Sequence, residues 1–112
     1  MSGRLQIGEF EELVLLITAI LGQEAYGIRV MDEIESQTGR KINISAVHTA
    51  LDRLDKKGFL QSYTGGATAE RGGRSKRFFK VTNLGMEAIK MAHETRNKLF
   101  DQIPQALLRF QA

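Results

Sequence analysis

The stretch Ser45–Val81 constrains the fold of this chain more than any other part of the sequence. In residues 46–57, apolar side chains recur at helical spacing and predict a short helix. Two runs rich in aromatic and β-branched residues, at 59–63 and 78–82, predict strands. Residues 64–77 between them hold four glycines, and the loop is too long for a tight hairpin. A short helix beside a projecting hairpin is typical of a winged DNA-binding element.

The charge of the chain is concentrated on the same stretch. The net charge is only +3, but residues 36–80 carry 10 basic and 3 acidic side chains. Residues 1–35 have the opposite balance, with 2 basic and 7 acidic side chains, and residues 81–112 carry 4 basic and 3 acidic. Such asymmetry suggests a polyanionic partner. The alternative is a solvated surface that is basic without binding anything.

Two helices are predicted ahead of this stretch. Residues 9–21 have apolar residues at helical spacing, and acidic side chains fill the first turn, where the helix dipole favours them. Leu15 and Leu16 widen the apolar surface, so this helix should be buried on more than one side, against the core alone or also against a second subunit. Residues 26–39 predict a second helix that stops at Gly39 and exposes acidic side chains.

The third helix is the candidate for reading DNA. Residues 40–44 alternate and predict a connector with one brief strand, after which Ser45 is a suitable N-cap. Short polar side chains near the start of the helix suit close approach to base edges, and cations near its end can reach phosphates. The expected core residues are Val47, Ala50, Leu51 and Leu54. The expected DNA contacts are Ser45, Ala46, His48, Thr49, Arg53 and Lys56.

The loop between the two strands adds a dense positive charge. Its candidate DNA contacts are Arg71, Arg74, Lys76 and Arg77. Arginine at a hairpin tip can bind phosphate or enter a narrow minor groove. We therefore expect this wing to lie on the flanking backbone or in the minor groove.

A fourth helix should follow Thr82, a suitable cap. Its apolar residues alternate three and four apart in a heptad-like seam that is interrupted at Arg96, and Pro104 should kink or restart the helix. A long helix with such a seam favours a dimer contact over a role in the core alone. The expected interface residues are Phe10, Leu13, Leu16, Ile89, Ala92, Leu99, Ile103 and Phe110.

Several classes of protein fit the sequence poorly. There is no cysteine, so no disulfide framework or thiolate metal site is expected, and no cofactor is indicated. The apolar run at 13–21 is too short to span a bilayer, and the first residues do not resemble a signal peptide. A cytoplasmic location without a membrane partner is therefore expected.

An enzymatic function has little support. His48 and His93 fall on different predicted helices without an evident catalytic partner, and the paired glycines belong to no phosphate-binding motif. His48 is either a groove contact or a solvated surface residue. At 112 residues the chain is expected to form one structural unit, with a DNA-binding part at 1–82 and a dimerisation helix at 83–112.

Seven segments, taken together in this order and spacing, resemble the PadR family of bacterial transcriptional regulators. They are EFEELVLL at 9–16, EAYG at 24–27, TGR at 38–40, AVHTALDRL at 46–54, KGFL at 57–60, ERGGRSKRFF at 70–79 and VTNLG at 81–85. The match extends over residues 9–89 in register. Each motif is weak alone, but the series is specific.

The resemblance implies a mainly α fold with a small β-hairpin, a winged helix-turn-helix domain followed by a C-terminal dimerisation helix. It also implies a homodimer that binds double-stranded operator DNA, usually as a repressor, with the third helix in the major groove. The C-terminal part here is shorter than in members with an extended helical domain, and the chain has no Trp. A small-molecule effector is therefore left open, with no ligand site assigned. The alternative is a winged-helix module that binds another protein rather than a specific DNA sequence.

Overall fold

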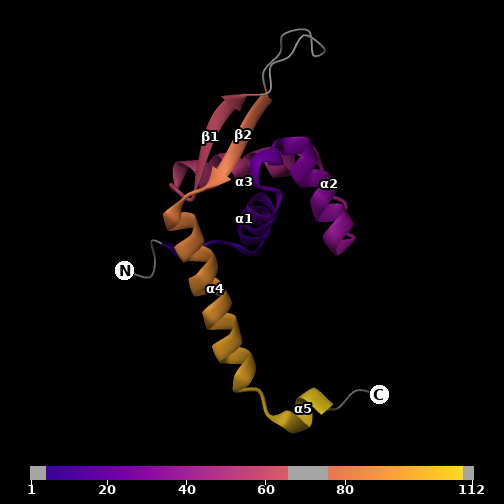
Figure 1. Ribbon diagram of the computed structural model, residues 1–112. Helices are drawn as coiled ribbons and strands as arrows, with labels where there is room; N and C mark the ends of the chain where they lie inside the picture. Colours follow the sequence, from indigo (N-terminus) through magenta and orange to yellow (C-terminus); the bar gives the residue numbers. More distant parts are fainter. Residues whose placement is uncertain (1–4, 66–75, 110–112) are drawn as a thin grey trace.

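The computed structural model describes residues 5–65 and 76–109. In chain order the elements are α1 (Glu9–Leu21), the 3-10 helix η2 (Gly22–Glu24), α2 (Gly27–Thr38), α3 (Ile44–Lys56), β1 (Leu60–Gly65), β2 (Lys76–Val81), α4 (Asn83–Asp101) and α5 (Gln105–Arg109). The first three helices cluster beside the β-hairpin, and α4 leads away from them to α5 (Figure 1). This is a winged helix fold with a long C-terminal helix, and the predicted fold class is confirmed.

The core lies between the first three helices and the inner face of the hairpin. Its largest fully buried side chains are Phe59, Phe79, Leu15, Ile34, Leu51, Leu54, Leu60, Val14, Val30 and Val47. The four core positions predicted for the third helix are all buried, because an α-helix returns to the same face every three or four residues. Each such Leu or Phe contributes about 1.5–3 kcal/mol on burial, so this cluster dominates the stability of the domain.

The hairpin is anchored to the helices by an additional contact. β1 and β2 pair antiparallel from Leu60 opposite Val81 to Gly65 opposite Lys76, which extends both strands farther toward the loop than predicted. The backbone N–H of Phe79 donates a 2.9 Å hydrogen bond to the carbonyl oxygen of Ala25, and Tyr26 forms a bridge with Phe78. The segment between α1 and α2 therefore fixes the hairpin against the domain.

The start of α3 differs from the prediction. The side chain of Asn43, not that of Ser45, caps the helix, since Asn43 Oδ1 accepts a 2.8 Å hydrogen bond from the N–H of Ala46. The brief strand expected at 40–44 is also absent. In the described residues the sheet consists of β1 and β2, and this segment pairs with neither. Ser45 consequently lies in the first turn of α3 with its side chain exposed.

The two ends of α4 have different environments. At the start, Thr82 caps the helix as predicted, accepting a 3.0 Å hydrogen bond from Gly85. A Cβ atom at Gly85 would overlap the carbonyl oxygen of Phe59, so this turn packs directly on the domain. Residues 93–101 are all exposed, and toward its C-terminal end α4 leads away from the other helices (Figure 1). Pro104 separates α4 from α5, which confirms the predicted restart.

Candidate nucleic-acid interface

The exposed side of α3 is a line of four side chains. Ser45, Thr49, Asp52 and Lys56 follow one another three or four residues apart, opposite the buried face, and all four are exposed. The sequence prediction included three of them as DNA contacts and omitted Asp52. The helical spacing in the sequence already places Asp52 outward, but this acidic residue was not among the predicted DNA contacts.

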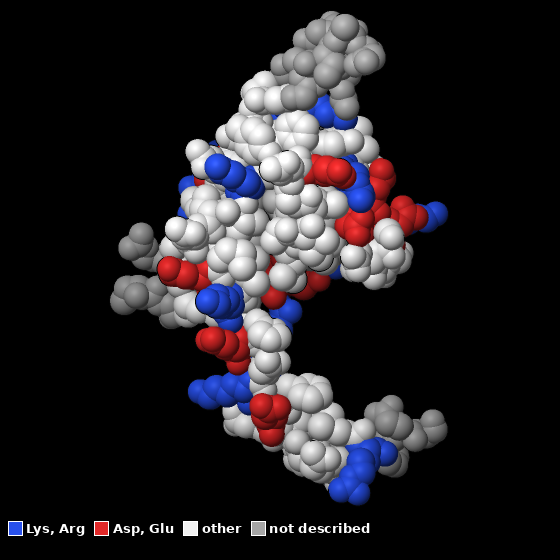
Figure 2. All heavy atoms as spheres, in the orientation of Figure 1, with Lys and Arg blue, Asp and Glu red and all other residues white. Residues whose placement is uncertain are grey.

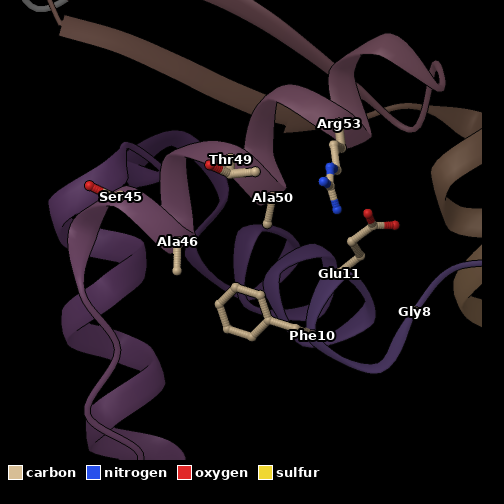
Figure 3. Close-up of a pocket in the computed structure, with 8 residues that line it drawn as sticks. All are labelled: Gly8, Phe10, Glu11, Ser45, Ala46, Thr49, Ala50 and Arg53. Atoms are coloured by element: carbon tan, nitrogen blue, oxygen red, sulfur yellow. The ribbon is translucent and has the colours of Figure 1, made fainter.

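Two other predicted contacts turn toward α1. Ala46 and Arg53 point from α3 toward Phe10 and Glu11, and these residues help to line a groove of about 450 Å³ (Figure 3). Ala46 is only partly exposed there. The carboxylate of Glu11 accepts a 2.6 Å hydrogen bond from Lys57 Nζ, whereas Arg53 makes no ion pair with a described residue. Arg53 is therefore a free cation at the edge of the exposed line.

His48 lies on the opposite edge of α3, at the junction with α2 and the hairpin. Its ring lies against Gly27, where an added Cβ would come 2.6 Å from His48 Cε1. Tyr26, Ile28 and Lys76 surround the same place and help to line a cavity of about 280 Å³. The absence of a side chain at Gly27 thus makes room for an exposed His48 beside the hairpin.

The described cations of the wing are not equivalent. Lys76 Nζ lies 3.6 Å from the centre of the Tyr26 ring, a cation–π contact. Arg77 reaches α3, where its guanidinium donates hydrogen bonds to Asp52 Oδ1 at 2.8 Å and Asp55 Oδ2 at 3.0 Å. Arg71 and Arg74 lie outside the described residues, so the structure does not place these two candidate contacts.

Some basic side chains of residues 36–80 form ion pairs with acidic side chains inside the domain. Arg40 pairs with Glu9 at 2.8 Å, and Lys57 pairs with Glu11 at 2.6 Å, so two cations of the basic middle third neutralise acids of α1. Five cations of residues 36–80 have no carboxylate partner within the described ranges: Lys41, Arg53, Lys56, Lys76 and Lys80. Four of these, all but Lys41, belong to α3 or to the hairpin beside it.

A group of acidic side chains lies over α2 on the face shown in Figure 2. Asp32 and Glu35 are exposed there. Hydrogen bonds from Gln37 and Arg29 hold the pKa of Glu33 below its ordinary value, which keeps that carboxylate ionised. This surface would repel the phosphates of a DNA backbone.

The predicted interface residues fall into two groups. Phe10, Leu13, Ile89 and Ala92 are partly buried in their own domain. In contrast, Leu16, Leu99 and Ile103 are exposed, as are Ile20, Phe100 and Leu107, which the prediction did not include. Phe110 lies outside the described residues.

The interruption of the seam at Arg96 has a structural cause. Arg96 Nη2 forms a 2.5 Å ion pair with Glu12 Oε1, and the Glu12 side chain is only 8% exposed. A buried carboxylate without a cation would be costly, so Arg96 both neutralises Glu12 and ties α4 to α1. Neither role could be inferred from the seam, because the partners are far apart in sequence.

The described residues contain neither a metal-binding group nor a membrane-spanning helix. In the two described ranges, no group of His, Asp and Glu side chains is arranged to hold a metal ion. Nor do these ranges include a helix that is long and apolar enough to cross a membrane.

Comparison with known proteins places the fold and interface in context. The family model described as "Transcriptional regulator PadR-like family" matches residues 15–91, which is more than half of the chain. No curated protein matches the chain.

Solved structures share the fold at low sequence identity. A PadR-like transcriptional regulator from Bacillus cereus is 15% identical with a TM-score of 0.71, over 91% of this chain and 93% of that one. A PadR family regulator from Eggerthella lenta is 21% identical with a TM-score of 0.66, over 88% and 83% of the two chains. One from Clostridium difficile is 17% identical with a TM-score of 0.68, over 86% and 97%.

Proposed function

Because the chain belongs to the PadR-like family of transcriptional regulators, we propose that it represses transcription by binding double-stranded operator DNA as a homodimer. In this mode α3 enters the major groove, and the hairpin lies on the flanking backbone or in the minor groove. The observation that carries the proposal is the exposed line on α3, where the small polar side chains of Ser45 and Thr49 precede the free cation Lys56.

The chemistry of this line suits a major groove. The groove admits one α-helix, and small hydroxyl side chains at the leading end let the helix backbone come close to base edges. Ser45 and Thr49 can each donate or accept a hydrogen bond with a base. His48 extends the same reading surface toward the hairpin. Arg53 and Lys56 are placed one to three turns later, where phosphates would flank the groove.

Repulsion by the acidic surface favours the same orientation. The cations without carboxylate partners on α3 and the hairpin attract the DNA backbone, whereas the carboxylates on α2 repel it. A duplex is therefore drawn to the side of the domain on which α3 is exposed. Arg71 and Arg74 add positive charge to the loop of the wing in the sequence.

The proposed dimer rests on the apolar side chains of α4 and α5. Leu99, Phe100, Ile103 and Leu107 are exposed, and the part of α4 that leads to them leaves the domain. A helix of five residues, such as α5, is marginal in water by itself, so packing against a second copy would stabilise this end of the chain. Leu16 and Ile20 of α1 are exposed apolar residues that can extend the contact. Residues 1–82 would then bind DNA, and residues 83–112 would join two such units.

A dimer of this kind has a direct route to repression. Two copies of α3 related by a two-fold axis read two half-sites, and an occupied operator blocks the transcription machinery. Such a regulator would act in the cytoplasm, where the DNA is accessible. No effector site is included in the proposal.

The salt dependence of DNA affinity tests the two roles proposed for α3. Lys56→Ala is expected to weaken binding to all duplexes evenly and to lower the slope of log affinity against log salt by about 0.9 per lost phosphate contact. His48→Ala should instead change the preferred sequence and leave the slope near the wild-type value. Fluorescence anisotropy with specific and random duplexes at several salt concentrations measures both quantities.

Lys98→Ala is the matched control for the lysine variant. Lys98 is an exposed residue of α4, far along the helix from the domain, so its loss should leave the slope unchanged. Equal effects of His48→Ala and Lys56→Ala on sequence preference would contradict the division between base reading and phosphate binding. Wild-type protein that shows no preference between specific and random DNA would contradict the proposed function itself.

A further inference from the structure

Arg77 has a different environment from the other described cations near α3. Its side chain, half exposed, crosses from β2 to α3 and donates to two carboxylates, at Asp52 and Asp55. The guanidinium carbon also lies 4.7 Å from the centre of the Phe79 ring. All of these contacts are within the domain, so Arg77 is engaged by protein before any DNA arrives.

Asp52 and Asp55 differ in the hydrogen bonds that they accept within the domain. Asp55 Oδ2 accepts hydrogen bonds from both Arg77 and Ser62, the latter at 3.1 Å, which joins α3 to both strands of the hairpin. Asp52 accepts from Arg77 through Oδ1, and no described residue donates to its Oδ2. Each carboxylate keeps one oxygen without a described donor. The Asp55 side chain is only 31% exposed and anchors the hairpin, whereas that of Asp52 is 51% exposed and holds its free oxygen on the exposed line of α3.

Asp52 is an acidic residue on the exposed line of α3, the surface proposed to face the negatively charged DNA. A carboxylate near phosphates is repelled, and an exposed ion pair contributes little to stability. The cost is offset where the carboxylate meets a hydrogen-bond donor on a base. In the major groove, guanine presents only acceptors, and thymine an acceptor and a methyl group, so both are unfavourable partners. Adenine offers an amino group, but its N7 acceptor lies beside that donor and is unfavourable for a carboxylate. Cytosine offers its N4 amino group with no adjacent acceptor on the same base, so it is the most favourable partner.

We propose that Asp52 is a specificity-determining residue that selects cytosine at one position of each half-site, and that Arg77 is the positioning residue that holds it there. This inference rests on the proposed function, because it requires α3 to lie in the major groove. Arg77 fixes Asp52 Oδ1 and thereby directs the free Oδ2 outward. It also joins β2 to α3, so the described strands of the hairpin and the reading helix approach DNA together.

Selection of bound duplexes from a random pool tests this assignment with the full chain. Asp52→Ala should bind random DNA at least as tightly as the wild type, because a carboxylate near phosphates is removed, and should lose preference for cytosine at one symmetric position by about tenfold. Asp52→Asn should shift that position toward adenine, because a carboxamide can donate to N7 and accept from N6. Glu87→Ala, which removes an exposed acid from α4, is the control for the change in net charge and should leave the selected sequence unchanged.

The variant Arg77→Ala distinguishes two roles of Arg77: holding Asp52 in place and binding a DNA phosphate. It is expected to weaken discrimination at the cytosine position without lowering the salt slope, since Arg77 is held by carboxylates rather than by DNA. In the Asp52→Ala background the same change should have little further effect at that position, because the two residues act as one unit. A salt slope lowered by about 0.9 per lost contact would identify Arg77 as a phosphate ligand and overturn its positioning role.

The outcomes distinguish this inference from the proposed function. Wild-type protein that enriches no sequence would overturn both. Wild-type protein that enriches a sequence which Asp52→Ala enriches equally would overturn the role of Asp52 alone. Thermal unfolding of every variant near the wild-type midpoint shows that a lost preference does not arise from a lost fold.

Discussion

Thr49→Glu is expected to reduce operator affinity by about 100-fold or more while the domain stays folded. Thr49 is exposed in the middle of the line on α3, so a longer side chain there meets no buried neighbour. In the proposed complex the new carboxylate lies close to base acceptors and phosphates, and like charges at an interface cost several kcal/mol. Gel-shift titration of the wild-type operator, together with circular dichroism, measures the loss of binding and the intact fold.

Ser36→Glu is the control for this substitution. It adds the same charge to an exposed position of α2, beside the acidic residues that we expect to face away from DNA. Its affinity should remain within about threefold of the wild type, because a surface charge distant from the duplex is largely screened. Full operator affinity in Thr49→Glu, or an equal loss in Ser36→Glu, would show that α3 does not face the DNA.

The double variant Leu99→Glu/Ile103→Glu is expected to be monomeric and to lose about 10²- to 10⁴-fold in operator affinity. Leu99 is 59% and Ile103 37% exposed, so neither substitution disturbs the core of the domain. Two carboxylates on the seam of each copy would oppose burial of the interface. Each monomer would then bind one half-site, and the gain from linking two binding units would be lost. Analytical ultracentrifugation gives the oligomeric state, and anisotropy gives the affinity.

Lys98→Glu supplies a control on the same helix that lowers the charge by the same two units. Lys98 is exposed and faces away from Phe100, because two residues along an α-helix lie on nearly opposite sides. This variant should remain dimeric and bind DNA normally. A dimeric Leu99→Glu/Ile103→Glu variant would place the subunit contact elsewhere, with the exposed Leu16 and Ile20 of α1 as the next surface to test.

Sequence periodicity was sufficient to predict much of the fold. The bounds of α1 agree with the predicted 9–21, because its apolar spacing begins and ends sharply. Gly39 ends α2 in the left-handed conformation that glycine adopts readily, with φ of 76°. The caps were less predictable. Asn43 and Ser45 are both suitable N-caps, and only the path of the backbone determines which side chain reaches a free N–H.

The partners of charged residues could not be predicted in the same way. Arg40, Lys57 and Arg77 all contributed to the basic excess of the middle third, yet each is paired with a carboxylate. The pairs join residues 22–46 positions apart in the chain, and only the packed fold brings them together. Charge counting therefore overestimated the number of described cations that are free to bind a polyanionic partner.

The helical spacing of α3 predicted its exposed side well, including the outward position of Asp52, which was not among the predicted DNA contacts. The structure shows Arg77 beside it, which offsets the charge of this carboxylate and leaves one oxygen free. Ala46 was included by the same spacing, but it turns toward Phe10 in the groove between α1 and α3 (Figure 3).

The most direct test of the central claim compares the affinity of the full chain for DNA selected from a random pool with its affinity for unselected DNA at physiological salt. A dimeric regulator with α3 in the major groove predicts a ratio of about 10³ or more. It also predicts one dimer on two symmetric half-sites, whose centres are separated by about 10–10.5 base pairs or a multiple of that distance. Equal affinity for the two DNA pools would contradict the claim, and so would a single monomer on an asymmetric site.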